Sequence, residues 1–420
     1  MFIFILLYLA LTIVRPQDYV PGLTGLPILS VVLLLAFFSW LLSSAKTFAA
    51  PQFVILPIFL LALMMSQVAA GWAGGALEVL AVFGPTMIAF FVLATVTASS
   101  PRRIALTFAV FVLCSCVLAM HGVDQSLNGI GWTGVGMAED GRIQYVGIFN
   151  DPNDLGLLFV AVLPMACFLS GRGGFLRRVF WLAAAGLLLY GVYLTNSRGA
   201  FLAVLAIGGA YVWYKRGIVT AGILGSVGLV VMQLLSSRMQ ELDADESSAA
   251  GRVDAWYEGL HMFLSHPLFG VGAGNFTEYN YLTAHNSFVL VLAETGFFGF
   301  ITWLAFVGYG FWMMLRILRS PPQPAAEGVV GEWADERALA LTLLLSQLGL
   351  FSAAFFLSRS YTVVMYLLIA VLVGYYVGVR KRYPALPSFS LAEGWWRWIP
   401  IALGSIFALF VIVEVLMHTS

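Results

Sequence analysis

The residue in this sequence best suited to proton transfer is His285, in the stretch AHNSFVLVLAETGFFGF. It closes a long polar segment and stands with Asn286 at the start of an apolar helix. A neutral imidazole near pH 7 can accept a proton from a hydroxyl group, but a lone histidine here is more often structural than catalytic. Glu294 lies roughly 13 Å further along the same helix, where an unpaired acid would be costly. We expect it to contact another helix or a polar cavity.

Arginine supplies a second kind of chemistry, because its planar fork grips phosphate with two hydrogen bonds and stays charged. Six arginines, without a lysine, fall in segments that face away from the side holding most of the basic residues. Such a set indicates an anionic ligand. For any single one, snorkelling to the lipid interface or pairing with an acid of its own loop is the alternative explanation. The six are Arg15, Arg142, Arg198, Arg238, Arg252 and Arg359.

Other patterns lack the context that their chemistry requires. The glycine-rich GVGAGN at 270–275 has no preceding strand and no following Lys-Ser or Lys-Thr, so a nucleotide-phosphate loop is not expected. Asp243 and Asp245 form an Asp-x-Asp pair, but without a soluble nucleotide-binding domain they are better explained as a solvated acidic run. The five histidines show no metalloprotease spacing and no neighbouring cysteine, so neither a metal nor another cofactor is expected.

Composition indicates a membrane protein that is helical throughout. Apolar residues make up 61% of the chain and charged residues 10%, and the mean hydropathy is +0.93. A soluble domain is closer to half apolar and a quarter charged. The formal net charge is zero, so no global field recruits nucleic acid. Cys114, Cys116 and Cys167 fall in or beside apolar runs and are expected to be buried, not disulfide partners.

The apolar runs predict about 12 to 13 transmembrane helices in a single integral membrane domain, residues 1–420. Each run is long enough to approach the ~30 Å of a hydrocarbon core, although 1–14 is short and is interpreted as a retained helix. Residues 286–315 are long enough to tilt but too short for two crossings. The predicted spans are 1–14, 24–44, 51–70, 77–96, 103–121, 154–170, 177–194, 199–214, 217–235, 286–315, 337–357, 361–379 and 396–417.

The distribution of lysine and arginine predicts the orientation, since cytoplasmic loops hold the excess. With the N-terminus inside, the outer side receives only the six arginines named above. Merging or splitting one span would move the basic run at 380–382 to the outside, so the count also supports the span assignments. The fifteen residues on the cytoplasmic side are Lys46, Arg102, Arg103, Arg172, Arg177, Arg178, Lys215, Arg216, Arg316, Arg319, Arg337, Arg380, Lys381, Arg382 and Arg397.

Two outer loops are long enough to form a site. The first, 121–154, ends in GIFNDPNDLG, where Asp and Asn before a helix have an ordinary explanation as N-caps. The second is a large loop, 236–285, that contains an amphipathic helix with Arg252 at the rim of its apolar arc. We expect this helix to lie on the membrane surface. The apolar arc is Val253, Trp256, Leu260, Phe263 and Leu264, and the polar side is Asp254, Glu258 and His261.

Four stretches, in their order and with this topology, resemble the O-antigen ligase superfamily. They are GIFNDPNDLG, TNSRGAFL, SSAAGRVDAW and HPLFGVGAGNF…AHNSFVLVLAETGFFG, and the resemblance runs from about residue 100 to 380. The superfamily contains O-antigen ligases, O-antigen polymerases and protein O-oligosaccharyltransferases. The resemblance implies a GT-C-like membrane fold that uses glycans carried on undecaprenyl diphosphate, without a nucleotide sugar or a metal. A thirteenth span exceeds the twelve of the ligases and is a departure from their pattern.

Carried over residue by residue, the resemblance places Arg198 and Arg252 on the lipid diphosphate and makes His285 the base for the acceptor hydroxyl. Guanidinium groups would stabilise the charge that develops on the leaving oxygen, and direct displacement would invert the anomeric centre. Arg142 and Arg359 are further candidates for the diphosphate site. The possible supporting residues are Asn153, Asn286 and Glu294.

The resemblance therefore implies a glycosyltransferase at the periplasmic face of a bacterial inner membrane, acting in lipopolysaccharide or other surface polysaccharide biosynthesis. The acceptor is left open among lipid A-core, a second glycan, as in a polymerase, and a protein. A flippase or transporter of lipid-linked glycans is the alternative from another class, although such proteins more often carry ionisable groups near mid-membrane and interrupted repeats. A structural subunit of an export complex would leave Arg198, Arg252 and His285 unexplained.

Overall fold

The computed structural model describes residues 1–44, 46–138, 141–236, 246–322, 324, 326 and 332–419, without the side chains of 231–236, 246–250 and 419. Within these residues the regular structure is helical, apart from two isolated β-bridges. The all-α fold class predicted from composition is confirmed. The helices are α1 (Phe2–Val14), α2 (Ile28–Leu41), α3 (Gln52–Ala69), α4 (Ala73–Thr97), α5 (Pro101–Asn128), α6 (Pro152–Ser170), α7 (Phe175–Thr195), α8 (Arg198–Arg216), α9 (Ile218–Ser236), α10 (Glu246–Ser265), α11 (Phe276–Tyr279), α12 (Ser287–Arg319), α13 (Trp333–Ala354), α14 (Val363–Arg382), α15 (Leu391–Gly394) and α16 (Trp398–Thr419).

Each of the thirteen predicted spans coincides with a helix, but their lengths differ from expectation. Among the described residues, nine helices are long and apolar enough to cross a membrane. The predicted spans 1–14 and 24–44 form helices of 13 and 14 residues, which are roughly 20 Å long and shorter than a ~30 Å core. The 19-residue α8 begins at Arg198 and ends with Lys215 and Arg216, so its ends are polar.

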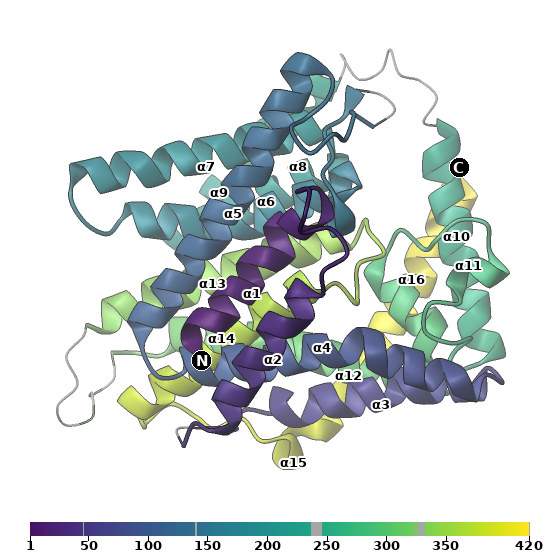
Figure 1. Ribbon diagram of the computed structural model, residues 1–420. Helices are drawn as coiled ribbons and strands as arrows, with labels where there is room; N and C mark the ends of the chain where they lie inside the picture. Colours follow the sequence, from purple (N-terminus) through teal and green to yellow (C-terminus); the bar gives the residue numbers. More distant parts are fainter. Residues whose placement is uncertain are drawn as a thin grey trace.

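The centre of the bundle is α14, which is buried along most of its length and packs closely on α4. Gly374 and Gly378 make this approach possible, because a Cβ at either position would overlap the α4 backbone at Ala94 or Ala98. Small residues that let two helix backbones come together are typical of membrane bundles. In Figure 1 α3 and α4 run side by side in the lower part of the view, and α7 lies in its upper left part.

The helix α12 is broken at Gly296, where φ is 62° and ψ is −162°. The segment 267–272 supplies backbone partners for the groups released by the break. Val271 and Gly272 N–H donate to the carbonyls of Ala293 and Glu294, both at 3.0 Å. Phe297 N–H donates to Pro267 O at 2.8 Å. The non-helical backbone is thus satisfied inside the protein, as it must be in a membrane.

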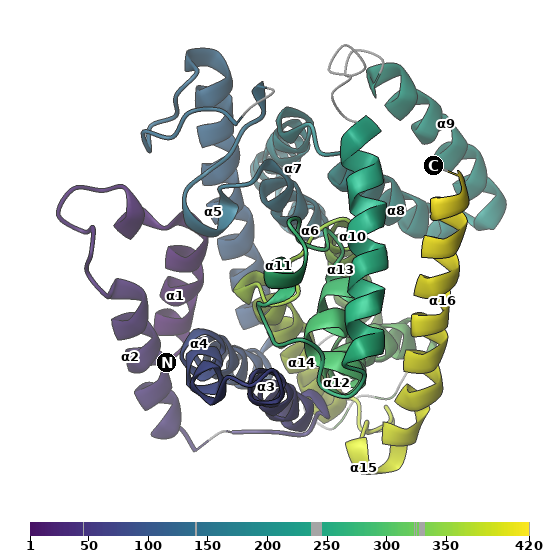
Figure 2. The ribbon, with the colours of Figure 1, turned by 90° about the vertical axis from the view of Figure 1, so that its right-hand side faces the viewer.

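The predicted amphipathic helix is α10, and protein covers part of its apolar arc. Trp256 and Leu260 are buried where α10 packs against α12 and α16, whereas Leu264 of the same arc is exposed. Asp254, Glu258 and His261 are exposed, as the sequence pattern predicts. Figure 2 shows α10 lying across the end of the bundle at which α3 and α4 are seen almost end-on.

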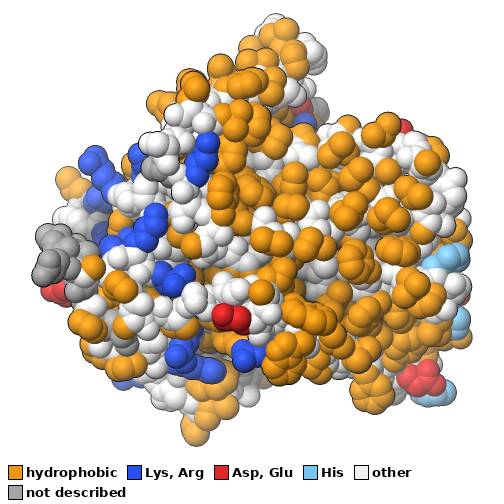
Figure 3. Space-filling view, turned by 90° about the horizontal axis from the view of Figure 1, so that it is seen from below, with side chains coloured by type: hydrophobic (Ala, Val, Ile, Leu, Met, Phe, Trp, Pro, Cys, Tyr) orange, Lys and Arg blue, Asp and Glu red, His pale blue; other side chains and the backbone are white. Residues whose placement is uncertain are grey.

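Two ion pairs, one from each predicted side of the membrane, lie at opposite ends of α6. At its start, Asp154 pairs with Arg359. Beyond its last turn, Arg172 pairs with Asp335 at 2.9 Å. Figure 3 shows Lys and Arg side chains gathered at the left of the view and His side chains at the right, with a hydrophobic surface between them. The lysine and arginine count predicts such a concentration of Lys and Arg at one end, and the orientation itself stays a prediction.

Candidate functional site

The site begins at the first turn of α6, where the predicted N-cap is confirmed for Asp151. Its Oδ1 accepts hydrogen bonds from the backbone N–H of Asn153 at 2.7 Å and from the Asn153 side-chain amide at 2.9 Å. Asn153 Oδ1 in turn accepts from Arg142 Nη2 at 2.8 Å, and Arg142 Nε donates to Thr195 O at 2.9 Å. Arg142 therefore ties the start of α6 to the end of α7.

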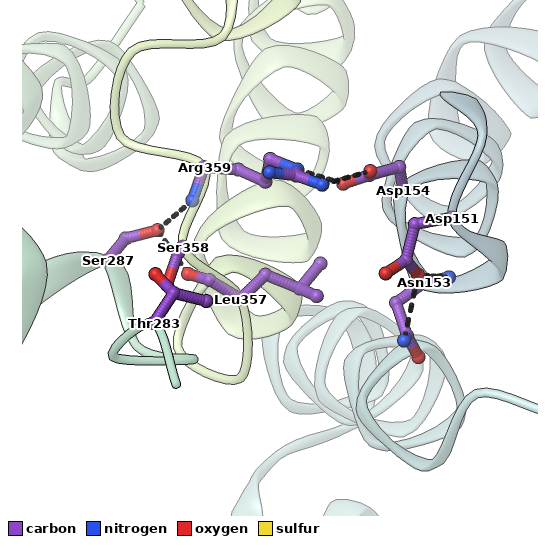
Figure 4. A network of polar contacts seen from close by, with 8 residues as sticks. All are labelled: Asp151, Asn153, Asp154, Thr283, Ser287, Leu357, Ser358 and Arg359. Carbon is purple, nitrogen blue, oxygen red and sulfur yellow. Dashed lines mark hydrogen bonds and ion pairs between the residues drawn. The ribbon is translucent and has the colours of Figure 1, made fainter. Parts of the chain in front are cut away.

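Asp154, three residues after Asp151, is not a cap but an ion-pair partner. Arg359 Nε donates to Asp154 Oδ1 at 2.6 Å and Arg359 Nη2 donates to Oδ2 at 2.7 Å (Figure 4). The Arg359 backbone N–H donates to Ser287 Oγ at 3.1 Å, and Ser287 Oγ donates to Leu357 O at 2.6 Å. These contacts fasten the loop between α13 and α14 to the starts of α6 and α12.

His285 is held between two buried residues, Ala284 and Asn286, with its backbone in the left-handed region at φ 46°. Asn286 is the N-cap of α12, because its Oδ1 accepts from the N–H groups of Phe288 at 2.9 Å and Val289 at 3.1 Å. The cap thereby fixes the helix start from which His285 projects.

Three charged groups act on the half-buried imidazole of His285. Burial lowers its pKa below the ordinary value of 6.5, and the positive charge of Arg252 lowers it further. Asp151 raises the pKa and Arg359 lowers it. The imidazole is therefore neutral near pH 7 and can accept a proton.

Arg252 and Arg198 approach this place from α10 and α8. Next to Arg252, Gly251 lies against Leu282, so the start of α10 touches the loop that leads to His285. Arg198 is the exposed first residue of α8, and the start of α8 packs on α6 where Ala200 meets Gly156. Neither arginine has an acidic partner among the residues whose side chains are described.

The charges of Arg252, Arg359 and Asp151 therefore all act on His285, and Arg198 is the first residue of α8. The guanidinium groups of Arg142 and Arg359 already donate hydrogen bonds to Thr195, Asn153 and Asp154 of the protein. Of the six outer arginines, Arg15 pairs with Asp18 of its own loop, as the alternative explanation has it. Arg238 lies outside the described residues, as do Asp243 and Asp245.

Glu294 forms a separate cluster below the break in α12. Its buried carboxylate accepts from Tyr361 Oη at 2.9 Å and from the Phe276 N–H at 3.3 Å. The expected contact is thus made by the first residue of the short helix α11 and by the loop between α13 and α14. Tyr361 was missed by sequence reasoning, because nothing in its surroundings signals a partner 67 residues away.

The fold and the site define a polytopic helical membrane protein with His285 and several arginines at one end of its bundle. Residues 182–304 match the family described as O-antigen ligase, and this range contains Arg198, Arg252 and His285. This match supports the O-antigen ligase/polymerase superfamily that the sequence resembles. Residues 1–173 match a family of unknown function (DUF5935). No curated protein matches the chain.

Proposed function

We propose that the protein moves a glycan from undecaprenyl diphosphate to an acceptor hydroxyl at the periplasmic face of a bacterial inner membrane. The match of residues 182–304 to the O-antigen ligase family supports a role in surface polysaccharide biosynthesis. The observation that carries the finer proposal is that His285 is a half-buried imidazole whose pKa the positive charge of Arg252 lowers. A base for an incoming hydroxyl and a cation for a departing diphosphate are the two groups that this transfer needs.

In the proposed reaction the acceptor oxygen attacks the anomeric carbon while the bond from that carbon to the diphosphate oxygen breaks. The hydroxyl proton passes to the imidazole of His285. Negative charge grows on the departing diphosphate, where Arg252 and Arg198 would bind it most strongly in the transition state. The N-terminus of α8 adds a favourable dipole for an anion. A single displacement of this kind inverts the anomeric centre and needs no metal ion.

Arg359 and Arg142 were candidates for the diphosphate site, and we assign them a positioning role instead. Their hydrogen bonds to Asp154, Asn153 and Thr195 make them positioning residues that hold the loops around His285. Asn153 and Asn286 support the same frame as a bridge and a helix cap. Glu294 holds the broken part of α12 against the neighbouring loops.

The test is single-turnover transfer by purified protein with an undecaprenyl-diphosphate glycan and, in separate reactions, lipid A-core, a second lipid-linked glycan and a pilin-like protein. The acceptor that gains mass identifies the activity. His285→Ala should keep donor binding and slow transfer by about 10²- to 10⁴-fold, the scale of general-base catalysis. His261→Ala is the matched control, because His261 is exposed on α10 and should be dispensable.

Two results would contradict the proposal. Near-normal transfer by folded His285→Ala would remove this residue from the mechanism. Absence of transfer to every acceptor, together with protein-dependent movement of the lipid-linked glycan across vesicles, would identify a transporter.

A further inference from the structure

A large cavity lies between α6, α7, α8 and α13, at the end of the bundle opposite His285. Its volume is about 1250 Å³. The starts of the helices that carry His285, Arg252 and Asp154 are remote from it, because the cavity reaches the last turn of α6 and the first turns of α13. It therefore belongs to no part of the site described above.

The mouth of this cavity is basic. Arg172, Lys215 and Arg337 line it together with one acid, Asp335, which leaves a formal excess of two positive charges. Asp335 is engaged by Arg172 at 2.9 Å. Among the described residues, neither Lys215 nor Arg337 has an acidic partner.

The two cations without an acid are held near Tyr214. Arg337 Nη2 donates to Tyr214 Oη at 2.9 Å and to Leu318 O at 3.1 Å. Its Nε is buried, with no hydrogen-bond partner in the described part of the chain. Lys215 Nζ lies 5.6 Å from the centre of the Tyr214 ring. An anion at the mouth would offset the charges of Arg337 and Lys215.

The depth of the cavity is apolar, with walls that include Leu163 of α6, Val204 of α8 and Leu345 of α13. Leu163 precedes Arg172 by 9 positions, Val204 precedes Lys215 by 11, and Leu345 follows Arg337 by 8. At 1.5 Å per helical residue, the apolar walls lie roughly 12–17 Å from the basic residues. A ligand that fills the cavity must therefore be anionic at one end and hydrocarbon over the rest.

We propose that this cavity binds a glycerophospholipid with an anionic headgroup, taken from the leaflet that the lysine and arginine count assigns to the cytoplasm. The phosphate lies between Arg337, Lys215 and Arg172, and an acyl chain runs inward between α7 and α8. A basic pocket between helices on the cytoplasmic side is a known arrangement for lipid headgroups. A soluble anion would leave the apolar walls uncovered. The proposal does not depend on the transferase activity.

The chain offers a matched pair of variants for testing this proposal. Gly208 lines the cavity, and a side chain added there meets nothing within 4 Å. Gly209 also faces open space but is not part of the lining. Gly208→Trp should fill the cavity, whereas Gly209→Trp should leave it open. For the charge, Lys215→Gln is compared with Lys46→Gln, a lysine of the same side that lies outside the cavity.

Cys167 provides the readout, because it lines the cavity and, contrary to the expectation from its apolar surroundings, is exposed, whereas Cys114 and Cys116 are buried. Its alkylation by N-ethylmaleimide is followed in nanodiscs of phosphatidylcholine with increasing phosphatidylglycerol. Phosphatidylglycerol should slow the alkylation, and Lys215→Gln should require roughly fivefold more of it, from about 1 kcal/mol per basic residue. A photoactivatable phosphatidylglycerol should crosslink to the wild type and to Gly209→Trp but not to Gly208→Trp.

Three results would overturn the proposal. Equal protection by phosphatidylcholine alone would show ordinary surrounding lipid without headgroup recognition. Equal protection by soluble glycerol 3-phosphate would show a site for a free anion. Undiminished crosslinking in folded Gly208→Trp would place the lipid outside the cavity.

Discussion

Arg359 and Asp154 are 205 residues apart in the chain and form an ion pair with two hydrogen bonds, of 2.6 Å and 2.7 Å. The two partners are unequally buried, since the Asp154 side chain is 5% exposed and that of Arg359 is 38% exposed. The pair fixes the loop between α13 and α14 beside His285. It therefore joins a part of the chain outside the O-antigen ligase match to the candidate site.

This inequality predicts that the two halves of the pair differ in their contribution to stability. Arg359→Gln leaves a buried carboxylate without its cation, and we expect a loss of about 1.5–3 kcal/mol in the free energy of unfolding. Asp154→Asn leaves a guanidinium that water can reach, so its loss should be smaller. Denaturant unfolding in detergent measures both values. Equal losses would show that burial does not govern the cost.

The pKa of His285 should shift in opposite directions when Arg252 and when Asp151 is replaced by a neutral residue. Arg252→Gln removes a cation that lowers the pKa, so the pKa should rise. Asp151→Asn removes an anion that raises it, so the pKa should fall, while asparagine still caps α6. Histidine-selective NMR titration of each variant measures the shifts. Shifts of the same sign would contradict the arrangement of these three groups.

The same pKa fixes the sign of the pH dependence of transfer. A base must be neutral, and burial keeps the pKa of His285 below 6.5, so the rate should be flat near pH 7 and fall only as pH drops through the lowered pKa. The pH–rate profile of single-turnover transfer checks this. A decline that begins well above pH 6.5 would point to another group.

The glycines of the loop and the broken helix should differ in how well they tolerate a side chain. Gly270 has φ 67°, and a Cβ there would meet the backbone of Glu294. Gly274 has φ 89° but faces open space. Gly274→Ala should therefore cost only the left-handed strain of about 1–2 kcal/mol, and Gly270→Ala should cost more. Thermal unfolding in detergent compares the two, and equal costs would argue against the close contact with α12.

The fold was largely predictable, because long apolar runs and the lysine and arginine count report directly on membrane helices. The break at Gly296 was not, since glycine inside an apolar run has no signature of its own. His285, Arg198 and Arg252 could be named from motifs, but the pairing of Arg359 with Asp154 depends on distant segments meeting. The amphipathic pattern of α10 located a helix correctly, yet it could not distinguish lipid from the protein surface that covers Trp256.

The orientation remains a prediction that labelling can decide. In a background without the native cysteines, Glu258→Cys and Glu332→Cys place exposed thiols on α10 and just before α13. An impermeant maleimide applied to intact spheroplasts should label the thiol at 258 only, because the count puts α10 outside. Labelling at 332 only would invert the orientation, and labelling at both positions would reject the assignment of spans.

Arg198 gives the sharpest test of the diphosphate site, since its exposed side chain has no acidic partner among residues with described side chains. Arg198→Lys keeps the charge but loses the planar fork, so donor binding should weaken by about 10- to 100-fold, the value of a charged hydrogen bond of about 1.5–3 kcal/mol. Arg216→Lys, at the exposed far end of the same helix, is the matched control and should be neutral.

The measurement is binding of the undecaprenyl-diphosphate glycan to each folded variant, alongside single-turnover transfer. A role for Arg198 in holding diphosphate requires that binding and transfer fall together in Arg198→Lys and not in Arg216→Lys. If Arg198→Ala and Arg252→Ala both bind the donor as tightly as the wild type, the two guanidinium groups do not hold the diphosphate. The charge on the leaving group would then have to be stabilised elsewhere, and Arg359 would be the next residue to test because it also acts on His285.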